Sequence, residues 1–170
     1  SCMSDIKTRH IIALLLENES GALSRVSGLF SARSYNIESL TVAPTDDSTL
    51  YRMPIVTYGT EDIVEQITKQ LNKLVDVVRV QELTKVDFVE REMALIKLKV
   101  SNATKESLFK YVEIFRGKIL DVGKEIIIIE LTGTAKKINS FLELFPDDNV
   151  IELVRSGALG IGRLSKNLKI

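Results

Sequence analysis

Apolar and polar residues follow one another along the chain in blocks whose periods predict strands and helices. Residues Arg9 to Leu16 form an apolar run of strand length, and from Ala22 onward apolar residues recur every three to four positions, as in an amphipathic helix. The helix faces expected to be buried carry Leu23, Val26, Leu29 and Phe30 in the first helix, and Ile63, Ile67, Leu71 and Leu74 in a second helix capped by Thr60. Strands at Asn36 to Val42, Leu50 to Tyr58 and Val75 to Leu83 complete a βαββαβ order.

The same order of elements is predicted a second time after residue 85. Its elements are a strand Glu92 to Val100, a helix Thr104 to Arg116, strands Ile119 to Val122 and Ile126 to Leu131, a helix capped by Thr134, and a strand Val150 to Val154. Gly117 stands where a left-handed helix end is expected. We therefore predict an α+β protein of two ferredoxin-like domains in tandem, residues 3–85 and 86–170.

Two local features lead to further predictions about the sheets. The runs Ile11 to Leu16 and Ile126 to Ile129 are apolar on both strand faces, although helices in this fold cover only one. We therefore expect the sister domain or another chain to cover the second face of each sheet. Pro54 lacks a backbone donor in a strand that is central in this topology, so we expect a bulge there.

Composition excludes several classes of protein. Lys plus Arg equals Asp plus Glu at 23 each and the sequence pI is about 6.6, so no net basic field exists to attract nucleic acid. No apolar run approaches the roughly 20 residues that span a membrane. Cys2 is the only cysteine and no secretory signal is visible, which together indicate a cytoplasmic protein. Ser1 and Cys2 precede Met3 as an expression remnant would, and we exclude them from the fold prediction.

The junction between the first strand and the first helix has the residues of a small anion site. Helix N-termini expose unpaired N–H groups and a partial positive charge. Gly21 leaves that end unobstructed, and the Asn18 amide can donate to a carboxylate or accept from an ammonium group, while Leu23 offers an apolar contact. A purely structural alternative is equally consistent with the spacing, namely that Ser20 is an ordinary N-cap and Gly21 a loop residue.

The stretch "LLLENESGALSRVSGLFSARSYNIESLTVAPTDD" resembles the start of the small, regulatory subunit of acetohydroxyacid synthase (acetolactate synthase), whose first domain is an ACT domain. The segments "KQLNKLVDVVRV", "VEREMALIKL", "EIFRGKILDV" and "VRSGALGIGR" continue the resemblance across nearly the whole chain. In that family the small subunit has no catalytic residues and no cofactor of its own. It activates a large catalytic subunit, which carries thiamine diphosphate, FAD and magnesium, and it confers feedback inhibition by valine in branched-chain amino acid biosynthesis.

The resemblance also implies where the effector binds. In the family valine lies between two ACT domains of a homodimer, so Asn18, Gly21, Ala22 and Leu23 would come from one copy and Asn36 and Ile37 from the other. Ala43 and Pro44 would shape the adjacent wall. The chain departs from the family at Ser34, where glycine is usual at the end of the first helix. A left-handed helix end would then carry a side chain, and the placement of Asn36 depends on that turn.

Other functions lack the residues that they need. His10 is the only histidine, has no catalytic signature around it and is expected at the surface, while Glu90 and Glu92 are expected to be solvated linker residues. No zinc spacing can be written with one cysteine, and the glycine-containing tail "SGALGIGRLSK" is expected to be a flexible end. RNA binding would require aromatic residues on the central strands, and "IIALLL" and "IIIIEL" have none. The alternative that remains open is an ACT-type sensor attached to another amino-acid pathway.

Overall fold

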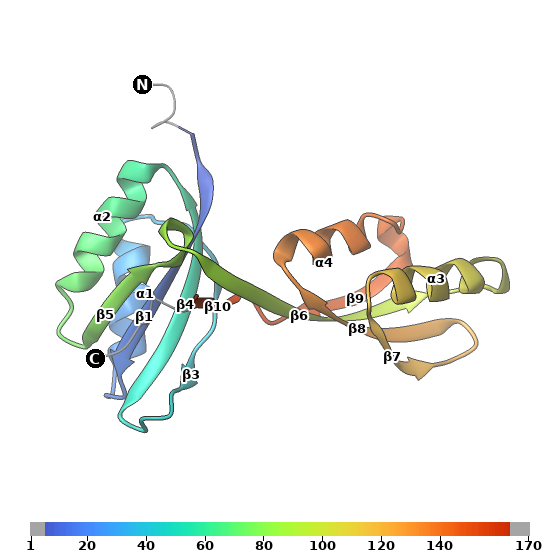
Figure 1. Cartoon of the computed structure of the whole chain (residues 1–170), viewed down its shortest axis with the longest axis horizontal. Coiled ribbons are helices and arrows are strands. Elements are labelled where there is room, and N and C mark those ends of the chain that lie inside the picture. Colours follow the sequence, from blue (N-terminus) through green and yellow to red (C-terminus); the bar gives the residue numbers. More distant parts are fainter. Residues whose placement is uncertain (1–5, 164–170) are drawn as a thin grey trace. The chain divides into compact units, whose positions relative to one another are not determined.

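The computed structural model describes residues 6–163, which form two units of sheet and helix (Figure 1). Among these residues, 6–89 and 158–163 belong to the first unit and 90–157 to the second. Contacts therefore join residues 86–89 and 158–163 to the first unit, whereas the sequence analysis placed them with the second. Two ferredoxin-like units in tandem confirm the predicted fold class.

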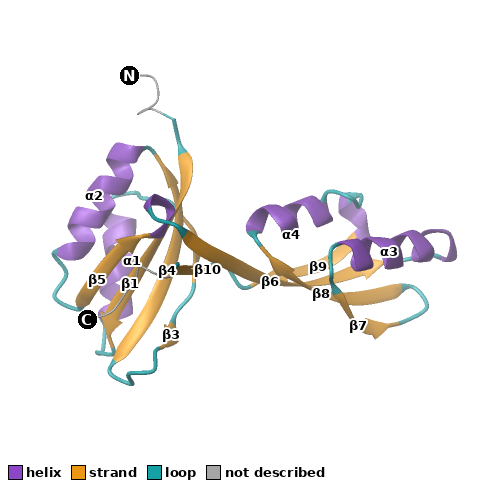
Figure 2. Cartoon of the chain, in the orientation of Figure 1, coloured by secondary structure: helices purple, strands orange, loops and turns teal. Residues whose placement is uncertain are grey.

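The first unit consists of a sheet with two helices on one face (Figure 2). Its elements are β1 (Thr8–Glu17), α1 (Ala22–Ala32), β2 (Ile37–Leu40), β3 (Ala43–Pro44), β4 (Leu50–Gly59), α2 (Glu61–Asn72), β5 (Val77–Glu82) and the short 3-10 helix η2 (Leu83–Lys85). The strand order is β2-β4-β1-β5, with β3 continuing beside β4. The long antiparallel pairing of β1 with β4 runs unbroken from Thr8 opposite Gly59 to Glu17 opposite Leu50.

The second unit repeats this arrangement, with a shorter second helix. Its elements are β6 (Phe88–Lys99), which begins in the first unit, α3 (Asn102–Ile114), β7 (Lys118–Val122), β8 (Ile126–Gly133), α4 (Ala135–Leu142), the 3-10 helix η3 (Asp147–Asn149) and β9 (Val150–Arg155). β6 pairs with both β8 and β9, and β7 pairs with β8. Its core contains Ile96, Ile129 and Phe141, all fully buried between the sheet and the helices.

Helix α1 turns a slightly different face to the sheet than the sequence predicted. Ala22, Val26 and Phe30, spaced four residues apart, are buried against β1 and β4. Leu23, which was expected in this buried face, is 45% exposed, and that prediction was wrong. Residue 23 lies about 100° around the helix from the buried Ala22, so it points away from the buried stripe.

The second face of the first sheet is covered by its own unit. Ile11, Ala13 and Val56 pack there with Leu83 and Ala158, and the partly buried Val86 and Phe88 complete the cluster. The face is thus covered, as predicted, but the covering residues Val86, Phe88 and Ala158, which the sequence analysis placed in the second domain, belong to the first unit. The corresponding face of the second sheet is less well covered, because Leu95 and Ile126 on that face remain 39% and 43% exposed.

The segment after β9 forms a strand, so the expected flexible end is wrong for its described part. β10 (Leu159–Gly162) pairs with β6, and Arg52 donates from Nη2 to the Gly160 carbonyl at 2.8 Å. Burial lowers the pKa of the Arg52 guanidinium from its ordinary value. A Cβ on Gly160 would lie only 2.6 Å from Cδ1 of the fully buried Leu83, so glycine is required for this close approach. The residues after 163 lie outside the described part.

Pro54 causes no bulge in β4. Its pairing with Ala13 of β1 lies within the unbroken register, whereas β2 ends at Leu40 and β3 begins at Ala43 on the other side. The Pro54 carbonyl points to this interruption and accepts from the Thr41 amide at 3.2 Å. The nitrogen of Pro54, which has no hydrogen to donate, therefore faces the break between β2 and β3. The bulge prediction was wrong because the pairing is interrupted in these neighbouring strands and not in β4.

Helices α1 and α3 both end with a non-glycine residue in the left-handed conformation. After α1, Ser34 has φ 58°, the Tyr35 amide donates to the Phe30 carbonyl at 2.9 Å, and the rings of Phe30 and Tyr35 meet edge to face at 5.8 Å. This is a Schellman ending with its hydrophobic contact. The expected left-handed position at Ser34 is confirmed, so Asn36 follows the turn that the family pattern implies.

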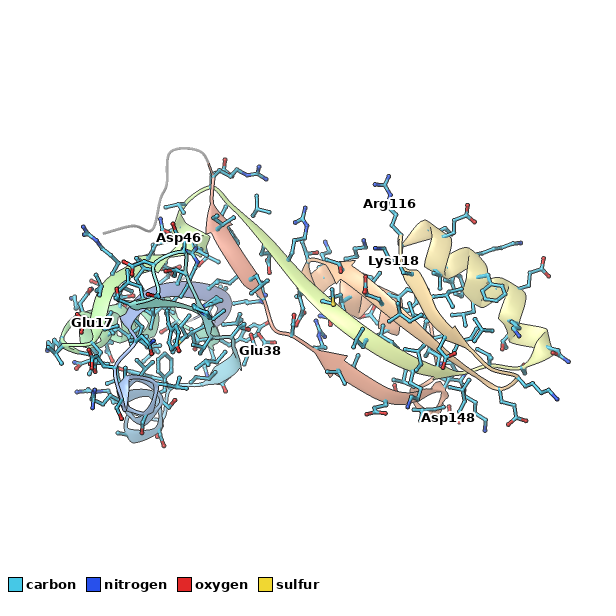
Figure 3. The ribbon with its side chains drawn as sticks, turned by 90° about the horizontal axis from the view of Figure 1, so that it is seen from below. Glu17, Glu38, Asp46, Arg116, Lys118 and Asp148 are labelled. Carbon is cyan, nitrogen blue, oxygen red and sulfur yellow. The ribbon has the colours of Figure 1, made fainter. Side chains whose placement is uncertain are left out.

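The second such ending corrects a prediction. Arg116, not Gly117, is left-handed with φ 57°, and its side chain projects outward (Figure 3). Gly117 is needed for a different reason, since a Cβ there would lie 3.2 Å from the Glu130 carbonyl oxygen.

Replacing Ser34 with glycine is expected to stabilise the first unit. A left-handed conformation costs an L-residue with a side chain about 1 kcal/mol that glycine avoids, and Ser34 is exposed, with no packing to lose. We expect Ser34→Gly to raise the thermal midpoint by roughly 4 °C or more, measured by circular dichroism. Ser31→Gly, inside α1, is the matched control and should lower it. A lower midpoint for Ser34→Gly would contradict the strain assigned to this turn.

Candidate effector site

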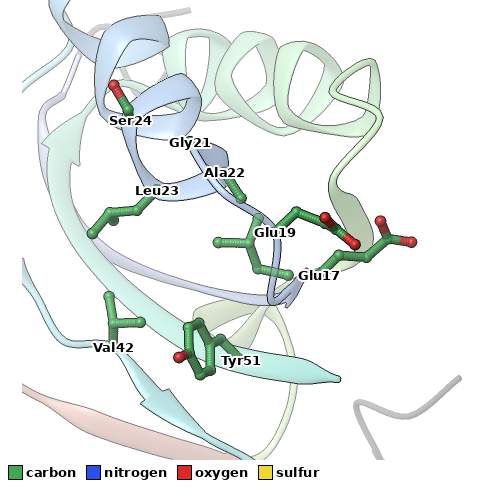
Figure 4. A pocket seen from close by; sticks show the side chains of 9 residues that line it. Glu17, Glu19, Gly21, Ala22, Leu23, Ser24, Val42 and Tyr51 are labelled. Carbon is green, nitrogen blue, oxygen red and sulfur yellow. The ribbon is translucent and has the colours of Figure 1, made fainter. Parts of the chain in front are cut away.

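A cavity of about 370 Å³ lies at the N-terminal end of α1 (Figure 4). Loop, helix and sheet all contribute to its wall, which consists of Leu16, Glu17, Glu19, Gly21, Ala22, Leu23, Ser24, Val42 and Tyr51. The strand β1 brings the chain to this corner, and α1 leaves from it. The junction identified in the sequence is therefore a cavity and not a filled turn.

The N-terminus of α1 has no side-chain cap among the described residues. Gly21 itself is the N-cap residue, with φ 83° and ψ −3°, so the Ser20 N-cap proposed as the structural alternative is wrong. In α2 and α4, by contrast, the hydroxyls of Thr60 and Thr134 accept from the amides of Ile63 and Lys137. The first-turn amides of a helix have no partner within the helix. In α1 those of Leu23 and Ser24, two residues that line the cavity, are therefore available to an anion.

Apolar side chains form the opposite part of the wall. Leu23, Val42 and Tyr51 face a common space in Figure 4, and the buried Leu16 also lines the cavity. The exposure of Leu23 follows from this position, because it borders the cavity instead of the core. The cavity therefore combines hydrogen-bond donors for a carboxylate with a surface for a short aliphatic side chain.

Two carboxylates that the sequence analysis did not select border the cavity. Glu17 ends β1 and Glu19 lies in the following loop, and both side chains extend to the same side of the cavity (Figure 4). A free amino acid carries an ammonium group, which these carboxylates could bind. The acidic residues of "LENES" were the available signal, but the sequence alone does not show that they border a cavity.

Arg25 and Asp76 were also missed. Nε of Arg25 lies 2.5 Å from Oδ2 of the buried Asp76, which immediately precedes β5. The hydrogen bond and charge of Arg25 lower the pKa of the Asp76 carboxyl, and Asp76 raises the pKa of Arg25. The two residues are 51 positions apart, so no local pattern in the sequence could pair them.

The lowered pKa of Asp76 predicts an acid-sensitive first unit. An aspartate ionises with a pKa of about 3.9 in the unfolded chain, and its folded pKa is lower. The ionised pair therefore contributes stability above about pH 4 that is lost as the pH falls through the folded pKa. We expect Asp76→Asn to flatten the acid side of a plot of unfolding free energy against pH. If urea titrations showed that the unfolding free energy of the variant falls with decreasing pH as steeply as that of the wild type, this prediction would be contradicted.

The structure brings only some of the predicted effector residues together. Gly21, Ala22 and Leu23 line the cavity. Asn18 lies just before them. Its backbone N–H donates to the Thr49 carbonyl at 2.9 Å, and Nδ2 of its side chain donates to the Ser48 carbonyl at 3.4 Å. Asn18 thus ties the β3–β4 loop to the junction.

Asn36 and Ile37 lie elsewhere in the single chain. Asn36 lines a second cavity, of about 530 Å³, with Lys7 and Tyr58, and its carbonyl accepts from the Thr57 hydroxyl. Ile37 opens β2, opposite Thr57. Neither residue lines the cavity at Gly21, so only a second copy could bring them to it. Ala43 and Pro44 form β3, next to Val42 of the cavity wall.

Two polar residues expected at the surface are buried. His10 is 4% exposed, with Nδ1 at 2.7 Å from Glu82 and Nε2 at 2.8 Å from the Thr8 hydroxyl. Glu92 is 6% exposed and binds Arg155 and the Gly157 amide. Both predictions were wrong because Glu82, Arg155 and Gly157 lie far from these residues in the sequence. Residues 6–163 hold no cluster of three or more His, Cys, Asp or Glu side chains suited to a metal ion. No described helix has the length and apolar character needed to cross a membrane.

Comparison with known proteins identifies the relatives of this chain. Residues 12–79 match the AHAS small subunit-like ACT domain, and residues 91–164 match the family described as small subunit of acetolactate synthase. The chain is 52% identical over 162 residues to the acetolactate synthase isozyme 3 small subunits of Salmonella typhimurium and Escherichia coli, covering 95% of this chain and 99% of each relative. The chain belongs to the acetolactate synthase small subunits. It is thus a regulatory subunit whose first unit is an ACT domain, and the predicted family is confirmed.

A solved structure supports the same assignment. The crystal structure of the acetolactate synthase small subunit from Thermotoga maritima superposes with a TM-score of 0.83 at 40% identity, over 94% of this chain and 99% of that one. As an acetolactate synthase small subunit, the chain has a catalytic large subunit as its partner. The cavity at Gly21 therefore lies in the ACT domain of a regulatory subunit.

Proposed function

We propose that this small subunit activates the catalytic large subunit of acetolactate synthase and makes it subject to feedback inhibition by valine. The cavity at the uncapped N-terminus of α1 is the observation that supports the second part. It offers amide donors, two carboxylates and an aliphatic wall, which are the complements of a small zwitterion with a branched side chain. The thiamine diphosphate, FAD and magnesium needed for the chemistry belong to the catalytic partner, and we place the assembly in the cytoplasm.

The orientation of valine follows from the chemistry of the wall. Its carboxylate accepts from the amides of Leu23 and Ser24, where the helix dipole is also favourable. Its isopropyl group contacts Leu23, Val42 and Tyr51. Asn36 and Ile37 of a second copy, in a homodimer formed through the ACT domains, close the site, with the Asn36 side chain and the cavity's carboxylates around the ammonium group.

Inhibition requires valine to prefer one of two arrangements of the paired ACT domains. About tenfold tighter binding to the inhibited arrangement would shift the equilibrium by roughly 1.4 kcal/mol for each site. The coupling is reciprocal, so the large subunit should weaken valine binding if valine weakens the activating complex.

Calorimetric titration of the branched-chain amino acids into the isolated protein tests the proposal. We expect L-valine to bind, and its affinity to change once the large subunit is present at saturation. Pull-down of the large subunit without valine tests the activating interaction separately. An absence of valine binding in both titrations would overturn the effector assignment. Failure to capture the large subunit would overturn the proposed activation.

A further inference from the structure

The side chain of Arg25 folds back over the N-terminus of its own helix. Its Nη2 donates to the Ser20 carbonyl at 3.2 Å, and its Nε lies 2.5 Å from Oδ2 of Asp76. A Cβ built on Gly21 would lie 3.0 Å from Nη1, so the guanidinium lies directly beside the backbone of the N-cap residue. One side chain thus contacts the loop before α1 and the start of β5 together.

Asp76 holds the other side of the same loop. Its carbonyl accepts from the Glu17 amide at 2.8 Å, and its carboxylate accepts from Arg25. The Asp76 side chain is 6% exposed, whereas that of Arg25 is 48% exposed. The loop from Glu17 to Gly21 is therefore held at its first residue by the Asp76 backbone and near its last residues by the guanidinium that Asp76 anchors.

Charge explains why the two residues act as a pair. A lone cation is unfavourable at a helix N-terminus, where the dipole is positive. The Asp76 carboxylate offsets this cost and fixes the planar guanidinium in one orientation, which lysine could not reproduce with a single nitrogen. With no side chain capping α1, this ion pair adds a side-chain link between the loop and the helix, beside the loop's backbone hydrogen bonds.

We propose that Arg25 and Asp76 are positioning residues for the effector, which together hold the loop from Glu17 to Gly21 in the conformation that opens the amides of Leu23 and Ser24 to a carboxylate. Neither residue lines the cavity, so both act through the loop. The inference rests on the proposed valine site and adds how that site is preorganised. Without the pair, part of the binding free energy would be lost in ordering the loop.

The test compares Arg25→Gln, Asp76→Asn and the double variant by calorimetry with L-valine, well below their unfolding temperatures. We expect each single variant to weaken valine binding by about fivefold or more, the lower end of ordinary coupling between sites. The double variant should be no weaker than the weaker single variant, because the two residues act as one unit. Hydrogen exchange without valine should be faster in all three at the amides of Glu17 and Ala22, which donate to the carbonyls of Asp76 and Glu19 in the wild type.

Glu65→Gln is the matched control, because it removes one charge from an exposed pair with Lys69 on α2 of the same unit. It should change neither the affinity nor the exchange at Glu17 and Ala22. Single variants that bind valine like the wild type, or single losses that simply add in the double variant, would overturn the positioning role. A wild type that binds no valine would instead refute the proposed effector. Hydrogen exchange would still decide whether the pair orders the loop.

Discussion

Gly21→Asp is expected to abolish inhibition by valine in the assembled enzyme while the small subunit still activates its catalytic partner. The new carboxylate would occupy the position where the effector's own carboxylate approaches the helix, and like charges repel. The side chain must also fit a backbone with φ 83°, beside the Arg25 guanidinium that would attract it. Acetolactate formation measured against valine concentration would show full activity at every concentration.

Gly21→Asn separates charge from shape in this experiment. Asparagine has the size of aspartate and tolerates the left-handed conformation, but it carries no charge. We expect the asparagine variant to keep a weakened response to valine that the aspartate variant lacks. If Gly21→Asp left the enzyme as sensitive to valine as the wild type, the cavity at α1 would not be the effector site.

Glu92→Ala should be the most damaging of the charge-removing substitutions in the second unit. Glu92, buried on β6, accepts from Nη2 of Arg155 at 2.6 Å and from the Gly157 amide at 2.9 Å, and Arg155 is the last residue of β9. Removing one partner of such a pair leaves the other partly buried without compensation, and we expect a loss of about 3 kcal/mol. Hydrogen exchange at the amides of β6 and β8, followed in urea, would report the stability of this unit directly.

Glu152→Ala provides the comparison on the same sheet. Glu152 pairs with Lys97 at 3.2 Å, but its side chain is 62% exposed. Exposed pairs contribute little, so we expect a loss below about 1 kcal/mol. Equal losses for the two variants would show that burial does not determine the value of these ion pairs.

The alternation of elements could be predicted from the sequence because each element carries its own period. Val26 and Phe30 mark the buried face of α1 by spacing alone, and Thr60 and Thr134 cap their helices as expected. Features that depend on distant contacts could not be predicted. β10 is a strand because Gly160 fits against Leu83 and Arg52, which lie far from it in the sequence.

The residues of the candidate site likewise divide into those that the sequence could identify and those that only the packing brings there. Gly21 and Leu23 could be chosen from the sequence because a strand, a glycine and a helix start follow one another there. Val42, Tyr51 and the Arg25–Asp76 pair reach the same corner only through the packing of β3, β4 and β5. His10 and Glu92 show the converse error, since a polar residue in the sequence gives no sign of the distant partner beside which it is buried.

The central claim is that the amides at the start of α1 bind valine in a site completed by a second copy of the chain. Amide chemical shifts of the isotope-labelled protein during an L-valine titration test it most directly. We predict saturable shifts at Leu23 and Ser24 together with shifts at Asn36 and Ile37, which do not line this cavity within one chain. Saturable shifts confined to other parts of the protein, with Leu23 and Ser24 unmoved, would contradict it.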